Sequence, residues 1–105
     1  MRVTLRYFDG CPNWETARER LEQAMRAAAV DADVEFEKVP TQEEAERLRF
    51  TGSPTVLIDG EDPFPAEAAS FGFACRVYVT ESGFEGSPSV GQLRDALARG
   101  VAGGL

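Results

Sequence analysis

The sequence predicts an α/β fold, and three observations support this class. Short apolar runs rich in β-branched and aromatic residues alternate with longer segments in which apolar residues recur at helical spacing. Glycine, proline and Asp-Gly turn signals separate most of these segments. The chain has 105 residues, the size of one domain, and no low-complexity linker divides it. We therefore expect a single α/β domain over residues 1–105 that contains four strands and three helices in the order βαβαββα.

The first two predicted elements are a strand and an amphipathic helix. Residues 2–8 are rich in β-branched and aromatic side chains until Asp9-Gly10 marks a turn. Pro12 stands at a helix-starting position, and apolar residues recur at three- and four-residue spacing from Trp14 to Ala28. The charged residues between them are expected to form a solvated face.

A second strand and helix follow. Residues 34–39 alternate apolar and polar side chains, which predicts a half-buried strand. The right-handed crossover rule places this strand parallel to the first. Thr41 and Glu44 form a capping-box pattern for a short helix over residues 42–50, and Gly52 suits a left-handed exit from it.

The remaining predicted elements are a β-hairpin and a closing helix. Residues 55–58 are continuously apolar apart from Thr55 and predict a buried strand, and residues 75–79 are its expected partner. We expect the closing helix over residues 89–99, ended by Gly100.

Two segments read as loops, residues 61–74 and residues 80–88. Four phenylalanines lie in or beside these loops, which is more aromatic surface than loops normally carry. Some of these side chains must join the core, and the rest are available to line a pocket or a partner surface. The four phenylalanines are Phe64, Phe71, Phe73 and Phe84.

Composition excludes several classes of function. Eighteen acidic against eleven basic residues give a net charge of −7, which opposes binding to nucleic acid or to an anionic membrane surface. Because the chain has no histidine, it cannot build Ser-His-Asp or Cys-His catalysis or the usual Cys/His zinc sites. Two cysteines are too few for a disulfide-rich secreted scaffold. We expect no signal peptide, no membrane span, no metal or organic cofactor, and a cytoplasmic location.

Cys11 is the candidate reactive residue. A strand delivers it to the first turn of a helix, where unpaired backbone N–H groups and the helix dipole favour a thiolate. The neighbouring Asp9 opposes this effect with a like charge. The two influences nearly cancel, so we expect a modestly activated thiol.

Two segments together resemble the thioredoxin-like superfamily: Cys11-Pro12-Asn13-Trp14 at the start of the first helix, and Gly52-Ser53-Pro54-Thr55 before an apolar strand. The resemblance implies a thioredoxin-like α/β fold, in which helices flank a central mixed four-stranded sheet. Its further implications are that Cys11 is a nucleophilic thiol and that the peptide bond before Pro54 is cis. It also implies a disulfide-containing protein or a glutathione-like thiol as partner. The expected substrate-binding residues lie in these two segments: Pro12, Asn13, Trp14, Ser53, Pro54 and Thr55.

Trp14 stands where two-cysteine members of this superfamily carry their second cysteine. An indole cannot resolve a mixed disulfide, so a second thiol has to come from elsewhere. The spacing of Trp14 to Ala17 and Leu21 favours core packing, and stacking against a ligand is the alternative. Asn13 either caps the helix or contacts substrate.

Cys75 has two interpretations. In a hairpin strand over residues 75–79 it would lie at the end of the sheet away from Cys11, as a buried inert thiol beyond disulfide range. Alternatively, the loop over residues 61–74 doubles back and brings Cys75 to Cys11 as a resolving thiol. The adjacent Arg76 is expected to be exposed, with activation of Cys75 or anion binding as its alternative.

Three functions are compatible with these residues. The first is a small monothiol oxidoreductase, in which Cys11 exchanges with disulfides and Pro54 helps to hold the substrate. The second is a non-catalytic thioredoxin-like binding module. The third is capture of mercury(II) or copper(I) by Cys11 and Cys75, because two thiolates suffice for a linear soft-metal site.

Overall fold

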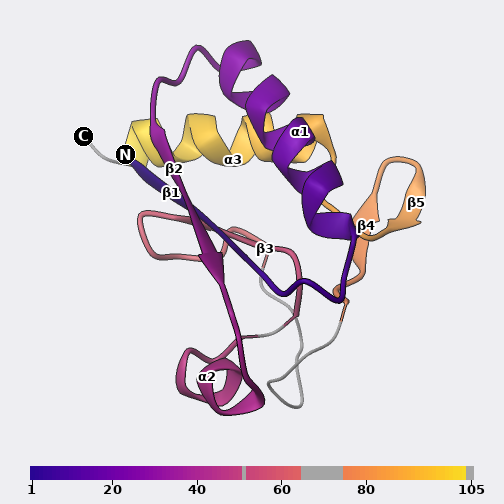
Figure 1. Ribbon diagram of the computed structural model, residues 1–105. Helices are drawn as coiled ribbons and strands as arrows, with labels where there is room; N and C mark the ends of the chain where they lie inside the picture. Colours follow the sequence, from indigo (N-terminus) through magenta and orange to yellow (C-terminus); the bar gives the residue numbers. More distant parts are fainter. Residues whose placement is uncertain (51, 65–74, 104–105) are drawn as a thin grey trace.

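The computed structural model in Figure 1 describes residues 1–50, 52–64 and 75–103. Strands and helices alternate in the first half, and the second half ends in a hairpin and a long helix. The elements in chain order are β1 (Arg2–Tyr7), α1 (Asn13–Ala27), β2 (Asp33–Lys38), α2 (Gln42–Arg47), β3 (Thr55–Ile58), β4 (Tyr78–Thr80), β5 (Gly83–Glu85) and α3 (Val90–Gly103).

The central sheet is mixed, and β1 is its middle strand in the order β2-β1-β3. β1 runs parallel to β2, with Leu5 beside Phe36, and antiparallel to β3, with Leu5 beside Val56. The α/β class and the parallel first two strands are therefore confirmed. β2 is an edge strand, and its Phe36 remains 49% exposed.

The predicted four-stranded sheet is not formed by the described residues, where the central sheet has three strands. β4 pairs with β5, which lies in the segment predicted as a loop over residues 80–88, and not with β3. Gly83 has a φ of 109°, a conformation that glycine adopts at little cost, and it lets the chain reverse within a few residues. The short local hairpin thus replaces the expected longer-range pairing.

Of the loop predicted over residues 61–74, the structure describes residues 61–64. Asp59 and Gly60, with φ values of 51° and 85°, form the expected turn after β3, and Glu61 closes it by accepting a hydrogen bond from the Ile58 N–H at 2.8 Å. Residues 65–74, including Phe71 and Phe73, lie outside the described residues.

The main hydrophobic core lies between the central sheet and the two long helices, α1 and α3, which also contact each other (Figure 1). Its residues come from β1, β3 and the inward faces of both helices, as the helical spacing predicts. They are Val3, Leu5, Ala17, Leu21, Ala24, Val56, Ile58, Leu93, Ala96 and Leu97. None of the described helices combines the length and apolarity needed to cross a bilayer.

Two predicted helix ends are wrong. α2 stops before residue 50 because Arg49, and not Gly52, takes the left-handed conformation, with a φ of 56°. The Phe50 N–H then bonds the Ala45 carbonyl at 2.8 Å, which turns the Phe50 ring into a second small core. α3 continues through Gly100, where a Cβ atom would approach Met1 Cε within 2.9 Å, so glycine permits close packing there.

Side-chain caps begin both later helices. Thr41 Oγ1 accepts a hydrogen bond from the Glu44 N–H at 3.1 Å, as predicted. Ser89 and Gln92 form a complete capping box, in which each side chain accepts from the other residue's backbone N–H. The Ser-x-x-Gln spacing of these residues in the sequence is the pattern of a capping box.

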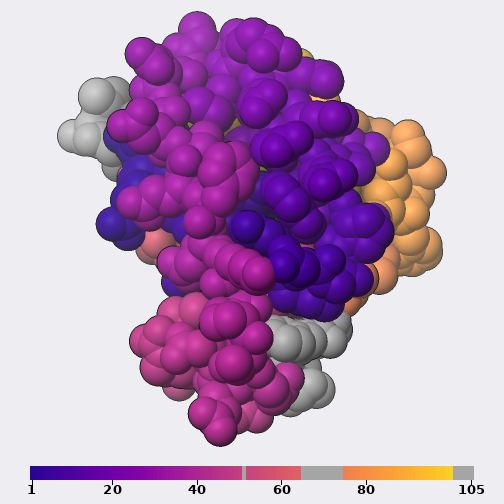
Figure 2. All heavy atoms as spheres, viewed as in Figure 1, coloured from indigo at the N-terminus to yellow at the C-terminus, as the bar shows by residue number. Residues whose placement is uncertain are grey.

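The β4–β5 hairpin is held against α1 by Arg20, and Figure 2 shows it at the surface beside that helix. The Arg20 guanidinium donates to Glu85 Oε1 at 2.9 Å and to the carbonyl oxygens of Ser87 and Pro88 at 3.3 and 3.2 Å. The hydroxyl of Thr80 donates to the other Glu85 oxygen at 2.6 Å. The orientation of the hairpin therefore depends on one arginine and one carboxylate.

We predict a pH-dependent stability loss in Glu85→Gln. Hydrogen bonds from the Thr80 hydroxyl and Arg20 lower the pKa of Glu85, so its stabilising effect is present above the ordinary carboxyl pKa, about 4.3, and is lost as pH falls through the lowered value. Denaturant titrations from pH 7 to pH 3 should show the variant less stable at neutral pH and the difference shrinking in acid. Glu19→Gln on α1 controls for the change in charge. A difference that stays constant over this range would contradict the assignment.

Candidate functional site

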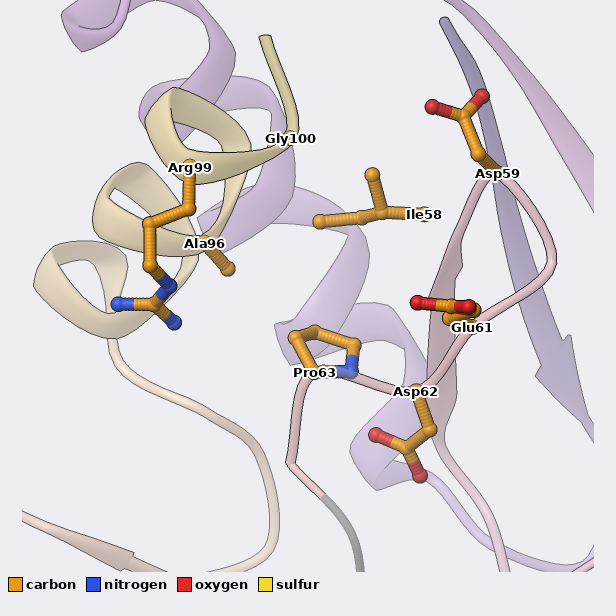
Figure 3. Close-up of a pocket in the computed structure, with 8 residues that line it drawn as sticks. All are labelled: Ile58, Asp59, Glu61, Asp62, Pro63, Ala96, Arg99 and Gly100. Carbon is orange, nitrogen blue, oxygen red and sulfur yellow. The ribbon is translucent and has the colours of Figure 1, made fainter. Parts of the chain in front are cut away.

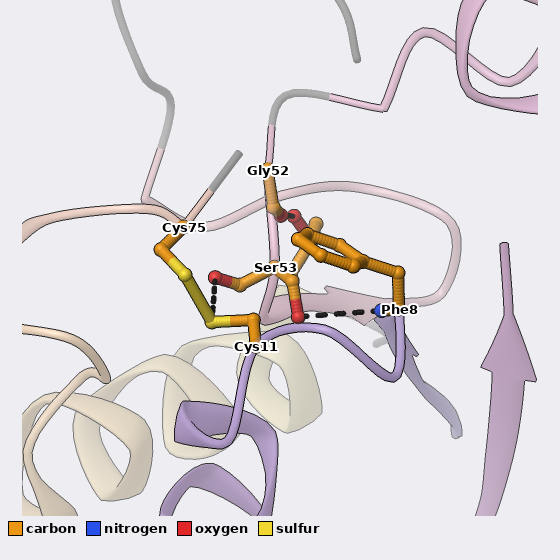
Figure 4. Close-up of a disulfide and its surroundings, with 6 residues drawn as sticks. Phe8, Cys11, Gly52, Ser53 and Cys75 are labelled. Atoms are coloured by element: carbon orange, nitrogen blue, oxygen red, sulfur yellow. Dashed lines mark hydrogen bonds between the residues drawn. A yellow bond between two sulfur atoms is a disulfide. The ribbon is translucent and has the colours of Figure 1, made fainter. Parts of the chain in front are cut away.

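The structure joins Cys11 and Cys75 in a disulfide across 64 residues of sequence, with their Cα atoms 6.0 Å apart (Figure 4). This separation lies within the range that disulfides normally span. The prediction of Cys75 as a buried, inert thiol beyond disulfide range is therefore wrong, and the approach of Cys75 to Cys11 that the alternative expected is confirmed. That prediction assumed a hairpin with β3, and the chain instead places Cys75 beside Ser53 in a parallel bridge.

Ser53 connects the two cysteine-bearing segments. Its carbonyl oxygen accepts a hydrogen bond from the Arg76 N–H at 2.8 Å and lies 3.6 Å from Cys11 Sγ. Its hydroxyl oxygen accepts from the Phe8 N–H at 3.4 Å, as Figure 4 shows. Ser53 is completely buried, so its polar atoms serve contacts within the chain.

The peptide bond between Ser53 and Pro54 is cis, as the resemblance implies. Pro54 and Thr55 are buried, and their polar groups also have partners in the chain. The Pro54 carbonyl accepts from the Tyr78 hydroxyl, while Thr55 Oγ1 donates to the Gly52 carbonyl. Burial raises the pKa of Tyr78, which keeps this phenol protonated as a donor. Ser53, Pro54 and Thr55, the predicted substrate-binding residues of this turn, are thus buried beside the disulfide and bonded within the chain.

Arg76 is buried, so the expectation of an exposed arginine is wrong. Its guanidinium pairs with Asp62 at 2.6 Å and donates to the Phe64 carbonyl. Its Cζ atom lies 4.5 Å from the centre of the Tyr78 ring. Buried arginine requires partners of this kind, and the segment after β3 supplies them. Arg76 thereby anchors the backbone that carries Cys75.

Pro12, Asn13 and Trp14 lie on the other side of Cys11. Pro12 is the exposed N-cap residue of α1, and it makes no side-chain capping hydrogen bond. The interpretation of Asn13 as the helix cap is therefore wrong, because Asn13 is the first residue of the helix itself. Asn13 lies against Gly86, where an added Cβ atom would come within 2.2 Å of the Asn13 side-chain nitrogen. Trp14 stacks on Tyr7 with ring centres 4.4 Å apart and packs against the main core, which agrees with its core interpretation.

The two cysteines differ in their access to solvent. Cys11 has no exposed surface, whereas Cys75 is an exposed residue. Close to Cys11 in the chain, the Asp9 carboxylate pairs with Lys38 at 2.5 Å, and the pKa of Lys38 is raised by this hydrogen bond and charge. The charge of Asp9 is therefore partly neutralised and opposes a thiolate on Cys11 less than its position in the sequence indicates. A reagent in solution meets Cys75 first.

A separate depression lies between the turn after β3 and α3 (Figure 3). It has a volume of about 410 Å³, and neither cysteine is among its lining residues. Its charged residues are Asp59, Glu61, Asp62 and Arg99. In the described part of the chain, no group of three or more Cys, Asp or Glu side chains is arranged to hold a metal ion. The disulfide is therefore the candidate site.

No protein-family model matches the chain, and neither the curated proteins nor the solved structures contain a match. A function for this chain is therefore inferred from the geometry around the two cysteines.

Sequence reasoning missed the anchoring role of Arg76. The signal available was an acidic residue, Asp62, in the segment before Cys75, but an ion pair over this separation has no characteristic spacing. The approach of Asn13 to Gly86 also had no local signature, because it depends on how the hairpin meets α1.

We predict that Arg76→Ala and Arg76→Lys both destabilise the protein, the alanine variant by roughly 3 kcal/mol, because alanine leaves the Asp62 carboxylate without its partner. Lysine cannot reproduce the planar fork that reaches both Asp62 and the Phe64 carbonyl. Denaturant unfolding of the oxidised proteins measures the effect, with Arg94→Ala at an exposed position of α3 as the control. A loss as small as that of the control would show that Arg76 does not anchor the Cys75 segment.

Proposed function

We propose that this protein is a thioredoxin-like thiol–disulfide oxidoreductase whose redox pair is Cys11 and Cys75. The observation that carries the proposal is the disulfide between a cysteine at the start of α1 and one that lies beside the Ser53–Pro54 cis turn. The two segments on which the resemblance depends are thus adjacent in space. The Cys75 thiol would replace the second cysteine that Trp14 displaces from the motif.

The thioredoxin-like assignment of the fold belongs to this proposal. The mixed β2-β1-β3 sheet with α1 and α3 packed against one core supports it. The segment at Cys75 and Arg76 runs beside Ser53, where we expect the fourth strand of such a sheet to begin. Beyond this bridge the fourth strand does not pair with β3, because β4 pairs with β5 instead.

Solvent access favours Cys75 as the sulfur that exchanges with external partners, although sequence alone assigns the nucleophile to Cys11. For reduction of the pair, an external thiolate attacks Cys75 Sγ, and the electron pair of the broken S–S bond leaves on Cys11 as a thiolate. The start of α1 stabilises that negative charge. A second external thiolate then releases Cys75 from its mixed disulfide, and the external thiols become a disulfide.

In the opposite direction, the reduced protein reduces a substrate. The Cys75 thiolate attacks a disulfide of a protein or a glutathione-like molecule, and the first substrate thiolate leaves and takes up a proton. Cys11, after losing its proton, attacks Cys75 Sγ and expels the second substrate thiolate. One substrate disulfide becomes two thiols, and two protein thiols become the Cys11–Cys75 disulfide. In a cytoplasmic location, which we also propose, cellular thiols would return the pair to the reduced state, and no metal or organic cofactor is needed.

Single-cysteine variants test this order. With glutathione disulfide, Cys11→Ser should form a stable mixed disulfide at Cys75, whereas Cys75→Ser should react at least about tenfold more slowly because its remaining thiol is buried. Mass spectrometry of quenched time points measures both, and unfolding in denaturant should equalise them. Faster reaction of Cys75→Ser would reverse the assigned order. If the reduced wild-type protein reduces neither glutathione disulfide nor a protein disulfide, the redox proposal fails and the non-catalytic binding module takes its place.

Soft-metal capture is a second candidate function, and the adjacency of the two sulfur atoms favours it. Mercury(II) and copper(I) accept two thiolates in a linear arrangement, and binding to the dithiol releases two protons. Reduced wild-type protein should take up one equivalent of copper(I) in competition with a chromogenic chelator. Cys75→Ser should lose at least about a hundredfold in affinity, because a single thiolate remains. Equal affinities would exclude a two-cysteine site.

A further inference from the structure

Three apolar side chains of the hairpin region are exposed to solvent. Val77, Val79 and Phe84 have exposed fractions of 67%, 69% and 80%, which exceed those of the other exposed large hydrophobic residues among those described, Met1 and Phe36. Single exposed apolar residues are common on protein surfaces, but a contiguous group marks an interaction site.

The chain geometry aligns this group with Cys75. From residue 75 to residue 80, exposed and buried residues alternate strictly, as they do where an extended chain turns successive side chains to opposite faces. Cys75, Val77 and Val79 are therefore the exposed residues of this segment, over about 13 Å, and the Cys75 sulfur lies where the exposed face meets the buried Cys11. Phe84 stands directly opposite Val79 in the antiparallel register of β4 and β5, on the same face. We call these four residues the Cys75 strip.

The opposite face of the same segment is fastened to the protein. Arg76 pairs with Asp62, the Tyr78 hydroxyl bonds the Pro54 carbonyl, and the Thr80 hydroxyl bonds Glu85. The strip is thus held in an extended form without any partner. A preformed surface loses little conformational entropy when a ligand binds to it.

The hairpin end of the strip carries three acidic residues, of which Glu85 pairs with Arg20 and Asp95 pairs with Arg94, so Glu81 contributes most of the negative charge there. Glu81 at the tip lies close enough to Glu85 and Asp95 to feel their charges, and the whole chain carries −7. Lysine or arginine beside an apolar segment complements this surface, and acidic residues oppose it. A glutathione-like molecule is small and anionic, so it matches neither the length nor the charge of the strip.

We propose that the Cys75 strip is the docking surface for a polypeptide substrate, namely an extended apolar segment that carries the reacting cysteine and is flanked by basic residues. This inference rests on the proposed function. The apolar side chains of the substrate cover Val77, Val79 and Phe84, and its disulfide lies at Cys75. The Cys75 thiolate attacks the substrate sulfur, the former disulfide partner leaves as a thiol, and Cys11 then releases the reduced peptide.

Peptides with an activated cysteine test the surface directly. Each peptide carries its cysteine as a mixed disulfide with thionitrobenzoate, whose release by the reduced protein is followed by absorbance. One peptide has leucines around the cysteine and lysines at its ends, a second replaces the leucines with serines, and a third replaces the lysines with glutamates. We expect the first to react about tenfold faster than either of the others, equivalent to about 1.4 kcal/mol.

Variants of the strip separate docking from chemistry. Phe84→Ser and Val79→Ser should lose the preference for the first peptide while reacting normally with glutathione disulfide. Phe36→Ser, which removes an exposed aromatic ring from the opposite edge strand β2, should keep it. Circular dichroism and sedimentation accompany each variant to compare folding and oligomeric state.

Failure of the docking surface and failure of the proposed function give different results in these experiments. Equal rates for the three peptides alongside normal reaction with glutathione disulfide would overturn the docking surface and leave the proposed function intact. A preference lost equally in Phe36→Ser would also overturn it. Concentration-dependent dimers that Phe84→Ser abolishes, without a peptide preference, would assign the strip to a second copy of the chain. No reaction with glutathione disulfide or any peptide would overturn the proposed function and the docking surface together.

Discussion

The arrangement of the site depends on the carbonyl group of Ser53. This oxygen accepts the Arg76 N–H at 2.8 Å and lies 3.6 Å from Cys11 Sγ, so it fixes both cysteine-bearing segments relative to one turn. The Ser53 hydroxyl ties the same turn to the end of β1 through Phe8. Because Ser53 and Cys11 have no exposed surface, the hydrogen bonds to the Ser53 carbonyl would be costly to lose. One buried residue therefore connects three segments that are remote in sequence.

The two cysteines differ in solvent exposure, and this difference decides which of them a reagent in solution reaches. Cys11 is covered completely, while Cys75 stands on an extended segment whose outward face is apolar. The inward face of that segment carries Arg76 and Tyr78, which hold it against the cis turn. The same alternation of side chains that anchors the segment thus presents its cysteine and its apolar groups to solvent.

Sequence reasoning succeeded where the physical cause was local. Helical spacing identified the buried face of α1, the Thr41 cap formed as expected, and the Asp59-Gly60 turn follows β3. It failed for the hairpin, because β4 had two possible partners and pairing energies over long separations leave no periodic signal. A local competitor, β5, prevailed since closing a short loop costs less entropy than closing a long one.

The sequence by itself determined the α/β class, the parallel first strands, the lack of histidine chemistry and the placement of Cys11 at the start of a helix, because periodicity, turn residues and composition act over short distances. Tertiary structure alone decided that Cys75 meets Cys11, that Arg76 is buried and that Val77 and Phe84 are left exposed. These outcomes depend on which remote segments pack together. That choice reflects the summed burial and hydrogen bonding of the whole chain, which no local pattern records.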